Sequence, residues 1–202
     1  LLAFAPRDPD PLIAGASVAM IRPRAPLRSG LRRRTGFWRA RDGSTAVEFA
    51  MVALPFFFMM FAILELGLVF VIDSILDNAT AETSRLVRTG RAESSGMTAE
   101  QFKTTLCGRM SIFQADCDAR ATVDVRVIPN FSTPNPPDPM ASGSFQTSGL
   151  GYDDGSAGST MLIRVWYKQP LVTPFMNEGL SRLKDGSAYL TATAVFRNEP
   201  FN

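Results

Sequence analysis

The chain has 202 residues and a formal net charge of +2, which bounds it to one modest domain with room for an anchoring segment. It contains no histidine, so Ser-His and Cys-His nucleophile pairs, histidine-ligated zinc and the usual neutral-pH general base are excluded. No phosphate-binding glycine loop, G-x-S-x-G motif or paired-cysteine metal motif is present. A catalytic site of the Ser-Lys or paired-carboxylate type is the one alternative left, and no motif in the sequence indicates such a site. We therefore expect no enzyme activity, no metal and no cofactor.

The charges are unevenly distributed along the chain. Residues 21–43 carry eight arginines and one acid, whereas residues 74–202 carry 12 Lys or Arg and 13 Asp or Glu. Short basic flanks stay on the cytoplasmic side of a membrane span. The basic stretch therefore predicts membrane orientation rather than nucleic-acid binding, and no nucleic-acid partner is expected. We expect residues 1–43 to form a disordered basic leader, with residues 1–19 as an upstream extension.

The longest apolar run predicts a membrane span. From Phe49 to Ile72 the only ionisable residue is Glu65. A helix of this length reaches about 36 Å, which exceeds the hydrocarbon core of a bilayer. We therefore expect a transmembrane helix over residues 44–73, with Asp73 at the exit from the bilayer.

The flanks orient this span with the N-terminus inside and residues 74–202 exported. A cleaved signal peptide is the main alternative, but its apolar core would hold only about 7–15 residues and end in a small-residue cleavage motif. Pro55 lies inside the span, where membrane helices tolerate proline. Glu65 is a candidate functional residue because carboxylates inside membranes are costly. Contact with another subunit, protonation and access to water all stay open for it.

Beyond the membrane the same helix is expected to continue into the exported part. Leu76, Ala79, Leu86 and Val87 form a broken apolar face, and Gly90 is a suitable C-terminal stop. The helix would then have about 45 residues, one half in the membrane and one half outside it. A short polar loop is expected after Gly90.

A second, shorter helix is predicted next. Thr98 and Gln101 have the spacing of a capping box, in which each side chain bonds the backbone of the other residue. Phe102, Leu106 and Met110 follow at intervals of four and would share one helix face.

The two cysteines of the chain lie in the exported part. Cys107 lies on the predicted second helix and Cys117 just past its end. In an oxidising compartment a single pair of this kind is expected to form a disulfide, which for such a short loop stabilises by about 3 kcal/mol. Two buried, unpaired thiols are the alternative.

Three segments with a period of two predict strands. They are ATVDVRVI (121–128), TMLIRVWYK (160–168) and AYLTATAVFR (188–197). The alternation and the β-branched and aromatic residues favour an antiparallel sheet with one buried face. The Pro-, Gly- and Ser-rich segment at about 130–158 is expected to be a flexible loop. The predicted fold class is thus α+β, with one long helix, a second short helix and about three strands.

The junction RDGSTAVEF places a glycine before a cleavage point and Glu48 at the fifth position after it. This junction resembles a class III prepilin peptidase site. The continuation GSTAVEFAMVALPFFFMMFAILELG is similar to the TadE-like family, pseudopilins and minor pilins of the Flp/Tad (type IVb) pilus assembly system. RLVRTG, MTAEQFKTTLCGRMSIFQADC and LTATAVFRNEPF also look like alphaproteobacterial members, so the resemblance covers about residues 43–202. It implies a pilin-like fold.

The resemblance also implies roles for particular residues. Cleavage after Gly43 would create a new amine on Ser44, and the missing side chain of Gly43 would let the backbone approach the peptidase's aspartates. Glu48 would pair with that amine in a neighbouring subunit or in its own. Glu48, Pro55 and Glu65 are expected where subunits pack in the membrane.

The implied partners are the prepilin peptidase, the Flp pilin, TadF- and TadG-like proteins, the inner-membrane assembly platform and membrane lipid. The implied location is the bacterial inner membrane, crossed once, with a cytoplasmic N-terminus and a periplasmic C-terminal domain. Incorporation into the pilus, a role in adhesion, and assignment among TadE, TadF and TadG stay open. The alternative is an unprocessed, signal-anchored periplasmic binding or sensor domain.

Overall fold

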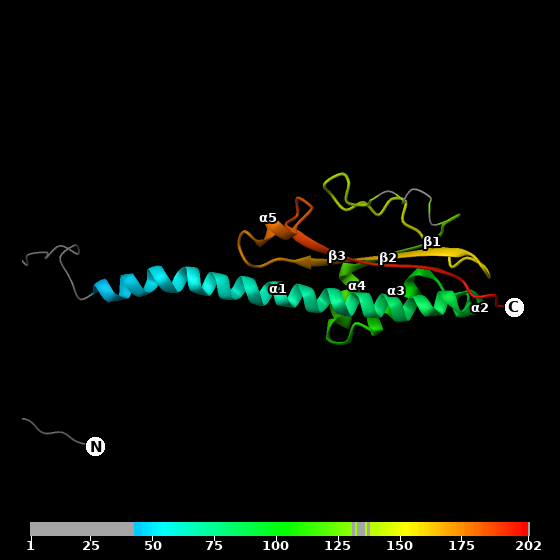
Figure 1. Ribbon diagram of the computed structural model, residues 1–202, viewed down its shortest axis with the longest axis horizontal. Coiled ribbons are helices and arrows are strands. Elements are labelled where there is room, and N and C mark those ends of the chain that lie inside the picture. Colours follow the sequence, from blue (N-terminus) through cyan, green and yellow to red (C-terminus); the bar gives the residue numbers. More distant parts are fainter. Residues whose placement is uncertain (1–42, 131, 133–135, 137, 202) are drawn as a thin grey trace, which may run out of the picture. The chain divides into compact units, whose positions relative to one another are not determined.

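The computed structural model describes residues 43–130, 132, 136 and 138–201. The leader predicted over residues 1–43 therefore lies outside the described residues except for Gly43, as does part of the predicted loop at 130–158. The first element is helix α1 (Ser44–Arg88), 45 residues long and continuous through Pro55. Figure 1 shows its first half extending beyond the rest of the described fold, which packs along its second half. The single long helix predicted from the sequence is confirmed.

The second half of α1 carries the buried stripe that joins it to the core. The stripe includes three hydroxyl side chains among the apolar ones. Thr83 and Ser84 donate to the carbonyls of Ala79 and Thr80 at 2.7 and 2.6 Å, whereas the hydroxyl of Thr80 has no hydrogen-bond partner among the described residues. Leu86, expected on the apolar face, is only half-buried. The buried residues are Val69, Ile72, Leu76, Ala79, Thr80, Thr83, Ser84 and Val87.

Gly90 follows the end of α1, as predicted. Its φ of +72° lies in the left-handed region that favours glycine. A Cβ at this position would also meet the ring of Phe201 at 2.4 Å. Near the C-terminal end of the chain, Glu199 bonds the side chain of Arg88 at 3.0 Å. The end of the helix and the end of the chain are therefore packed together.

Short helices follow where the sequence predicted a loop and one helix. The polar loop expected after Gly90 instead contains α2 (Arg91–Ser95), which is bounded by Gly90 and Gly96, both with positive φ. Helix α3 (Ala99–Gly108) begins with the predicted capping box, in which Thr98 and Gln101 bond each other's backbone. A 3₁₀ turn (Ser111–Phe113) and a helix that was not predicted, α4 (Gln114–Arg120), complete this layer.

The sheet has the predicted three antiparallel strands in the order β1-β2-β3. They are β1 (Ala121–Val127), β2 (Thr160–Pro170) and β3 (Ser187–Arg197). The register pairs Val125 with Ile163, and Ile163 with Ala194. Alternate residues of β2 are fully buried on the face that packs with the helices: Met161, Ile163, Val165 and Tyr167.

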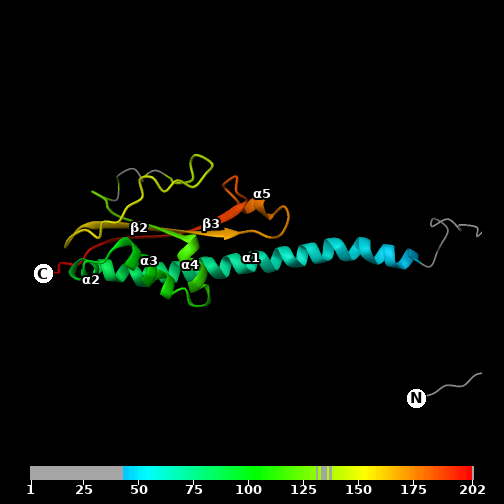
Figure 2. The same ribbon diagram turned by 180° about the vertical axis from the view of Figure 1, so that it is seen from behind.

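The opposite face of the sheet is also partly covered, although Thr191 and Thr193 of β3 stay exposed, so the expectation of a single buried face is wrong. Trp166 is buried there with Met140 and Leu183, and Phe145 and Tyr189 pack beside them. Residues 138–150 supply most of this cover and run across the face turned away from α1 in Figures 1 and 2, and Leu183 comes from the turn before β3. The sequence did not reveal this because a Pro-, Gly- and Ser-rich segment has no periodicity that would predict packing.

The covering segment is attached to the edge of the sheet by backbone bonds. Val125 and Tyr152 form an isolated parallel bridge. The amide of Val125 donates to the carbonyl of Gly151, and the amide of Asp153 donates to the carbonyl of Val125, both at 2.9 Å. Residues 151–153 thus extend the sheet beyond β1.

Candidate functional site

The first half of α1 presents apolar side chains that the described fold leaves uncovered. Phe49 and Leu54 are 71% and 75% exposed, and large apolar residues remain exposed as far as Val71. Within the part of the chain that the structure describes, α1 is the one helix long and apolar enough to cross a membrane. A surface of this kind is stable only in lipid or against other apolar protein surfaces.

The predicted processing residues lie at the start of this helix. Gly43 directly precedes α1, Ser44 is its first residue, and Glu48 follows four residues later. All three are exposed. Residues four apart lie on one helix face, so the backbone nitrogen of Ser44 and the carboxylate of Glu48 are separated by about one turn. A Cβ at Gly43 would meet nothing within 4 Å, so the fold itself does not require glycine there.

Glu65 contacts a distant turn of its own chain. The turn comprises residues 171–175, between β2 and α5 (Met176–Leu180), and is called the tip below. The carboxylate of Glu65 accepts hydrogen bonds from the backbone amides of Val172 and Thr173, the second at 2.8 Å. The sequence offered contact with another subunit, protonation or water for Glu65, and the structure adds this intrachain contact.

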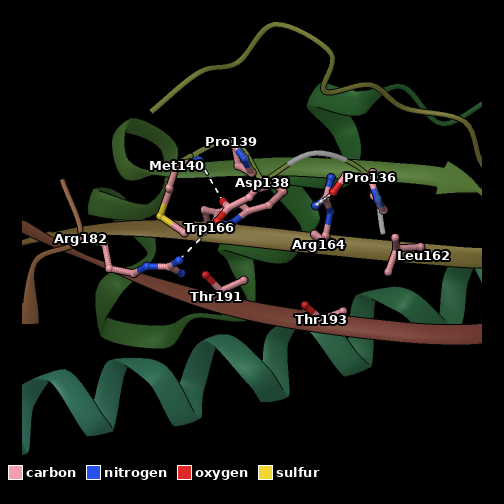
Figure 3. A pocket seen from close by; sticks show the side chains of 10 residues that line it. All are labelled: Pro136, Asp138, Pro139, Met140, Leu162, Arg164, Trp166, Arg182, Thr191 and Thr193. Atoms are coloured by element: carbon pink, nitrogen blue, oxygen red, sulfur yellow. Dashed lines mark hydrogen bonds and ion pairs between the residues drawn. The ribbon is translucent and has the colours of Figure 1, made fainter. Parts of the chain in front are cut away.

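A cavity of about 320 Å³ lies between the outer face of the sheet and a segment formed by Pro136 and residues 138–140 (Figure 3). Its two arginines are already paired: Arg164 bonds Asp124 at 2.8 Å, and Arg182 reaches Asp138 at 3.4 Å. Because neither guanidinium is left without a carboxylate, the cavity lacks an uncompensated charge that would select an anionic ligand. The lining residues are Pro136, Asp138, Pro139, Met140, Leu162, Arg164, Trp166, Arg182, Thr191 and Thr193.

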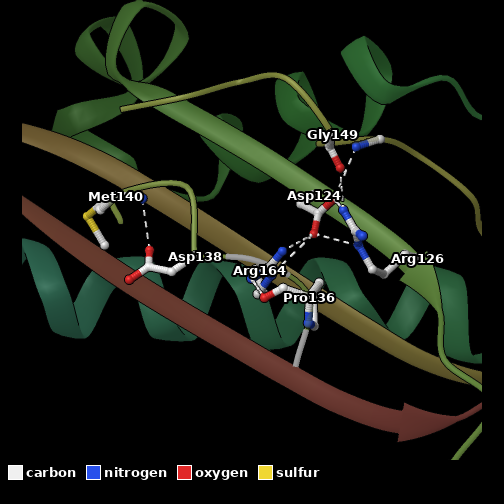
Figure 4. A network of polar contacts seen from close by, with 8 residues as sticks. Asp124, Arg126, Pro136, Asp138, Met140, Gly149 and Arg164 are labelled. Carbon is white, nitrogen blue, oxygen red and sulfur yellow. Dashed lines mark hydrogen bonds and ion pairs between the residues drawn. The ribbon is translucent and has the colours of Figure 1, made fainter. Parts of the chain in front are cut away.

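Asp124 is the centre of the polar network beside this cavity (Figure 4). Its side chain is fully buried, and it pairs with both Arg126 and Arg164. It also accepts a bond from the amide of Gly151 at 3.0 Å. Burial acts to raise the pKa of Asp124, but the hydrogen bonds from Arg126, Arg164 and Gly151 outweigh it, so the pKa of the carboxyl lies below its ordinary value.

The arginines of this network connect the sheet to the covering segment. Arg126 donates to the carbonyl of Gly149 at 2.8 Å, and Arg164 donates to the carbonyl of Pro136 at 3.5 Å. Arg164 also stacks over the ring of Trp166, 4.8 Å from its centroid. The network therefore attaches Pro136, Gly149 and Gly151 of the covering segment to the sheet.

The two cysteines are joined. The Cα atoms of Cys107 and Cys117 are 5.4 Å apart and their sulfur atoms are bonded. Cys107 lies on α3 and Cys117 on α4, and both are buried. The bond therefore ties together two helices that pack on the sheet.

Replacing Cys107 by serine is expected to lower the amount and the protease resistance of the C-terminal domain. Loss of the cross-link restores loop entropy to the unfolded chain, worth about 3 kcal/mol for a loop of this size. The measurement is limited proteolysis of membranes, with wild-type protein treated with a reductant as the matched control. Equal resistance of the oxidised protein, the reduced protein and the variant would contradict this prediction.

Residues 43–85 match the family model of TadE-like proteins. The matched stretch starts at the glycine of the predicted junction and covers nearly all of α1. The resemblance to the TadE-like family inferred from the sequence is thus confirmed over these residues. No curated protein and no solved structure gives a significant match to the chain.

This TadE-like segment and the membrane-span-like helix fit a protein related to the Tad pilus and a single pass through a membrane. The family is one of pilus components, which implies association with a membrane and with other components of that system. The roles predicted for Gly43, Ser44, Glu48 and Pro55 stay predictions. The contact of Glu65 with the tip was missed, because its partners are backbone amides more than one hundred residues away.

Proposed function

We propose that this chain is a TadE-like pseudopilin or minor pilin of the Tad (Flp) pilus system, processed by a prepilin peptidase after Gly43. The observation that carries the proposal is the family match over residues 43–85, which coincides with a single continuous helix. In this role the first half of α1 anchors the protein in the inner membrane before assembly. Residues 74–202 then form a periplasmic domain, and the disulfide suits that oxidising compartment.

Two features of the junction support processing at this position. A Cβ on Gly43 would meet open space, so a glycine is not needed for folding, and recognition by a peptidase is a separate reason for it. Glu48 is one turn into an apolar helix, where a carboxylate is costly unless it is paired. An amine on Ser44, created by cleavage, would supply a cation on the same helix face.

The partners in this proposal are the prepilin peptidase, the Flp pilin, TadF- and TadG-like proteins and the assembly platform. The uncovered apolar surface of α1 is suited to both lipid and other pilin helices, so Glu48 and Pro55 would lie where subunits pack. The cavity on the sheet gives little support to the alternative of an anchored binding or sensor domain, because its arginines are paired within the chain.

The test is the N-terminal residue and the intact mass of the protein purified from its own membranes. We expect a mature chain that begins at Ser44. Replacing Gly43 by valine is expected to leave most of the protein as the longer precursor, because the branched side chain keeps the backbone away from the peptidase. Gly67→Val is the matched control, since a Cβ at Gly67 also meets open space and lies far from the junction.

A wild-type chain that still carries the arginine-rich leader would overturn the processing step. It would leave a signal-anchored periplasmic domain as the better account. Equal processing of Gly43→Val and Gly67→Val would show that Gly43 is not the residue before the cleaved bond.

A further inference from the structure

The tip lies along the apolar half of α1. In addition to the two backbone bonds to Glu65, the ring of Phe175 packs edge-on against the ring of Phe58, with centroids 6.1 Å apart. Figures 1 and 2 both show the turn that precedes α5 lying beside the helix, beyond the ends of the strands. The C-terminal domain thus reaches back along the segment expected to cross the bilayer.

The tip is apolar and exposed at this position. Val172 is 87% exposed and Phe175 is 72% exposed. Phe175 also has a φ of +68°, a conformation that is uncommon for an aromatic residue and costs free energy. Strained backbone of this kind is concentrated at functional contacts.

The predicted transmembrane helix, residues 44–73, is longer than the hydrocarbon core of the bilayer requires. Residues 44–73 would form a helix about 45 Å long, whereas the hydrocarbon core is about 30 Å thick. Residues 44–65 alone reach about 33 Å. Counted from Ser44, the excess of the predicted transmembrane helix is therefore the eight residues after Glu65, beside which the domain already packs through Val69 and Ile72.

We propose that the tip enters the outer leaflet of the bilayer and that the carboxylate of Glu65 marks the membrane surface. The apolar side chains of Val172 and Phe175 would then continue the lipid-facing surface of α1, and the occupant of this surface is lipid. The exit from the hydrocarbon core moves from the neighbourhood of Asp73 to Glu65, about 12 Å along the helix, and the exposed Phe70 and Val71 would then lie in the headgroup region.

The hydrogen bonds at Glu65 make this depth energetically acceptable. A backbone amide without a partner is costly near hydrocarbon, and so is a carboxylate. The carboxylate of Glu65 accepts from the amides of Val172 and Thr173, so both groups are satisfied by the same contact. Phe175 reaches Phe58, which lies about 10 Å deeper along the helix, so its ring would lie among the acyl chains.

The experiment measures the depth of a spin label in lipid. The full chain is reconstituted singly in lipid nanodiscs, so that a second copy cannot cover the tip. A nitroxide is attached at Val172→Cys, and only that thiol reacts because the native cysteines are bonded to each other. Leu54→Cys is the lipid reference and Ile112→Cys the water reference; both positions are apolar and well exposed.

We expect relaxation by oxygen to exceed relaxation by a water-soluble nickel chelate several-fold at residues 54 and 172, and the reverse at residue 112. If the label at residue 54 reports lipid but the label at residue 172 reports water, this inference is overturned, while the membrane span stands. Water at both positions would overturn the span, and with it the anchoring step of the proposed function.

A second variant tests the contact with Glu65. In the Val172→Cys protein, Glu65→Leu removes both acceptors from the tip while keeping the helix apolar. We expect the label to become more mobile and more accessible to the nickel chelate by at least about two-fold. An unchanged spectrum and depth would show that Glu65 does not hold the tip at the membrane.

Discussion

Replacing Asp124 by alanine is expected to destabilise the C-terminal domain by about 3 kcal/mol or more. The change leaves the guanidinium groups of Arg126 and Arg164 without the buried carboxylate that both contact, and it removes the acceptor for the amide of Gly151. The measurement is urea unfolding of the full chain in detergent, followed by the fluorescence of Trp166, which lies under Arg164. A Trp38→Phe background leaves Trp166 as the only tryptophan.

Glu82→Ala is the matched control for a carboxylate that pairs with arginine at the surface. Glu82 contacts Arg109 at 3.1 Å, but its side chain is 58% exposed, so its loss should cost less than about 1 kcal/mol. Equal midpoints for the Asp124 and Glu82 variants would contradict the structural role given to Asp124.

The same carboxyl sets a pH dependence whose sign follows from its pKa. Because the folded-state pKa of Asp124 lies below its ordinary value, its contribution is fully present above the pKa of the unfolded chain, about 4. The contribution is lost as the pH falls through the folded-state pKa. The stability difference between wild type and Asp124→Asn should therefore be constant near neutrality and shrink below about pH 4. If the stability difference persists unchanged to pH 3, the contribution of Asp124 comes from packing rather than from its ionised carboxylate.

Local patterns predicted much of the fold. The capping box at Thr98 and Gln101, the glycine stop at Gly90 and the alternation in β2 each depend on residues close in sequence, and each is present as expected. The junction at Gly43 with Glu48 pointed to the TadE-like family for the same reason, since the motif is contiguous. Such short-range interactions can be predicted because both partners lie within a few residues of each other in the sequence.

Contacts between distant segments were not predictable in the same way. Asp124 alternates with valines in β1, a pattern typical of a solvent-facing side chain, yet it is fully buried because residues 138–151 fold over it. Glu65 is bonded by backbone amides, which any sequence supplies and no motif marks. Helix α4 was missed because its seven residues, QADCDAR, carry too few apolar positions to show a period.

Replacing Glu48 by alanine is expected to leave membrane insertion intact and to reduce the number of pili by at least about ten-fold. Insertion into the membrane depends on the apolar run, and removal of a carboxylate lowers the free-energy cost of inserting the helix. Assembly in the proposed function depends on the pairing of Glu48 with the amine of Ser44, which fixes the register in which helices pack. The measurement is pilus counts by electron microscopy beside the amount of mature protein in the membrane fraction.

Two further variants separate charge from shape at this position. Glu48→Gln keeps the size and a hydrogen-bond acceptor but loses the charge, so it should fail like alanine if an ion pair is what matters. Glu100→Ala removes an exposed carboxylate of the C-terminal domain and should leave pilus numbers unchanged. Normal piliation by Glu48→Ala would refute the pairing role. Normal piliation by Glu48→Gln alone would show that a hydrogen bond, rather than an ion pair, is sufficient for assembly. If Glu48→Ala fails while its mature chain still begins at Ser44, the defect lies after processing, in the packing of one apolar helix against the next.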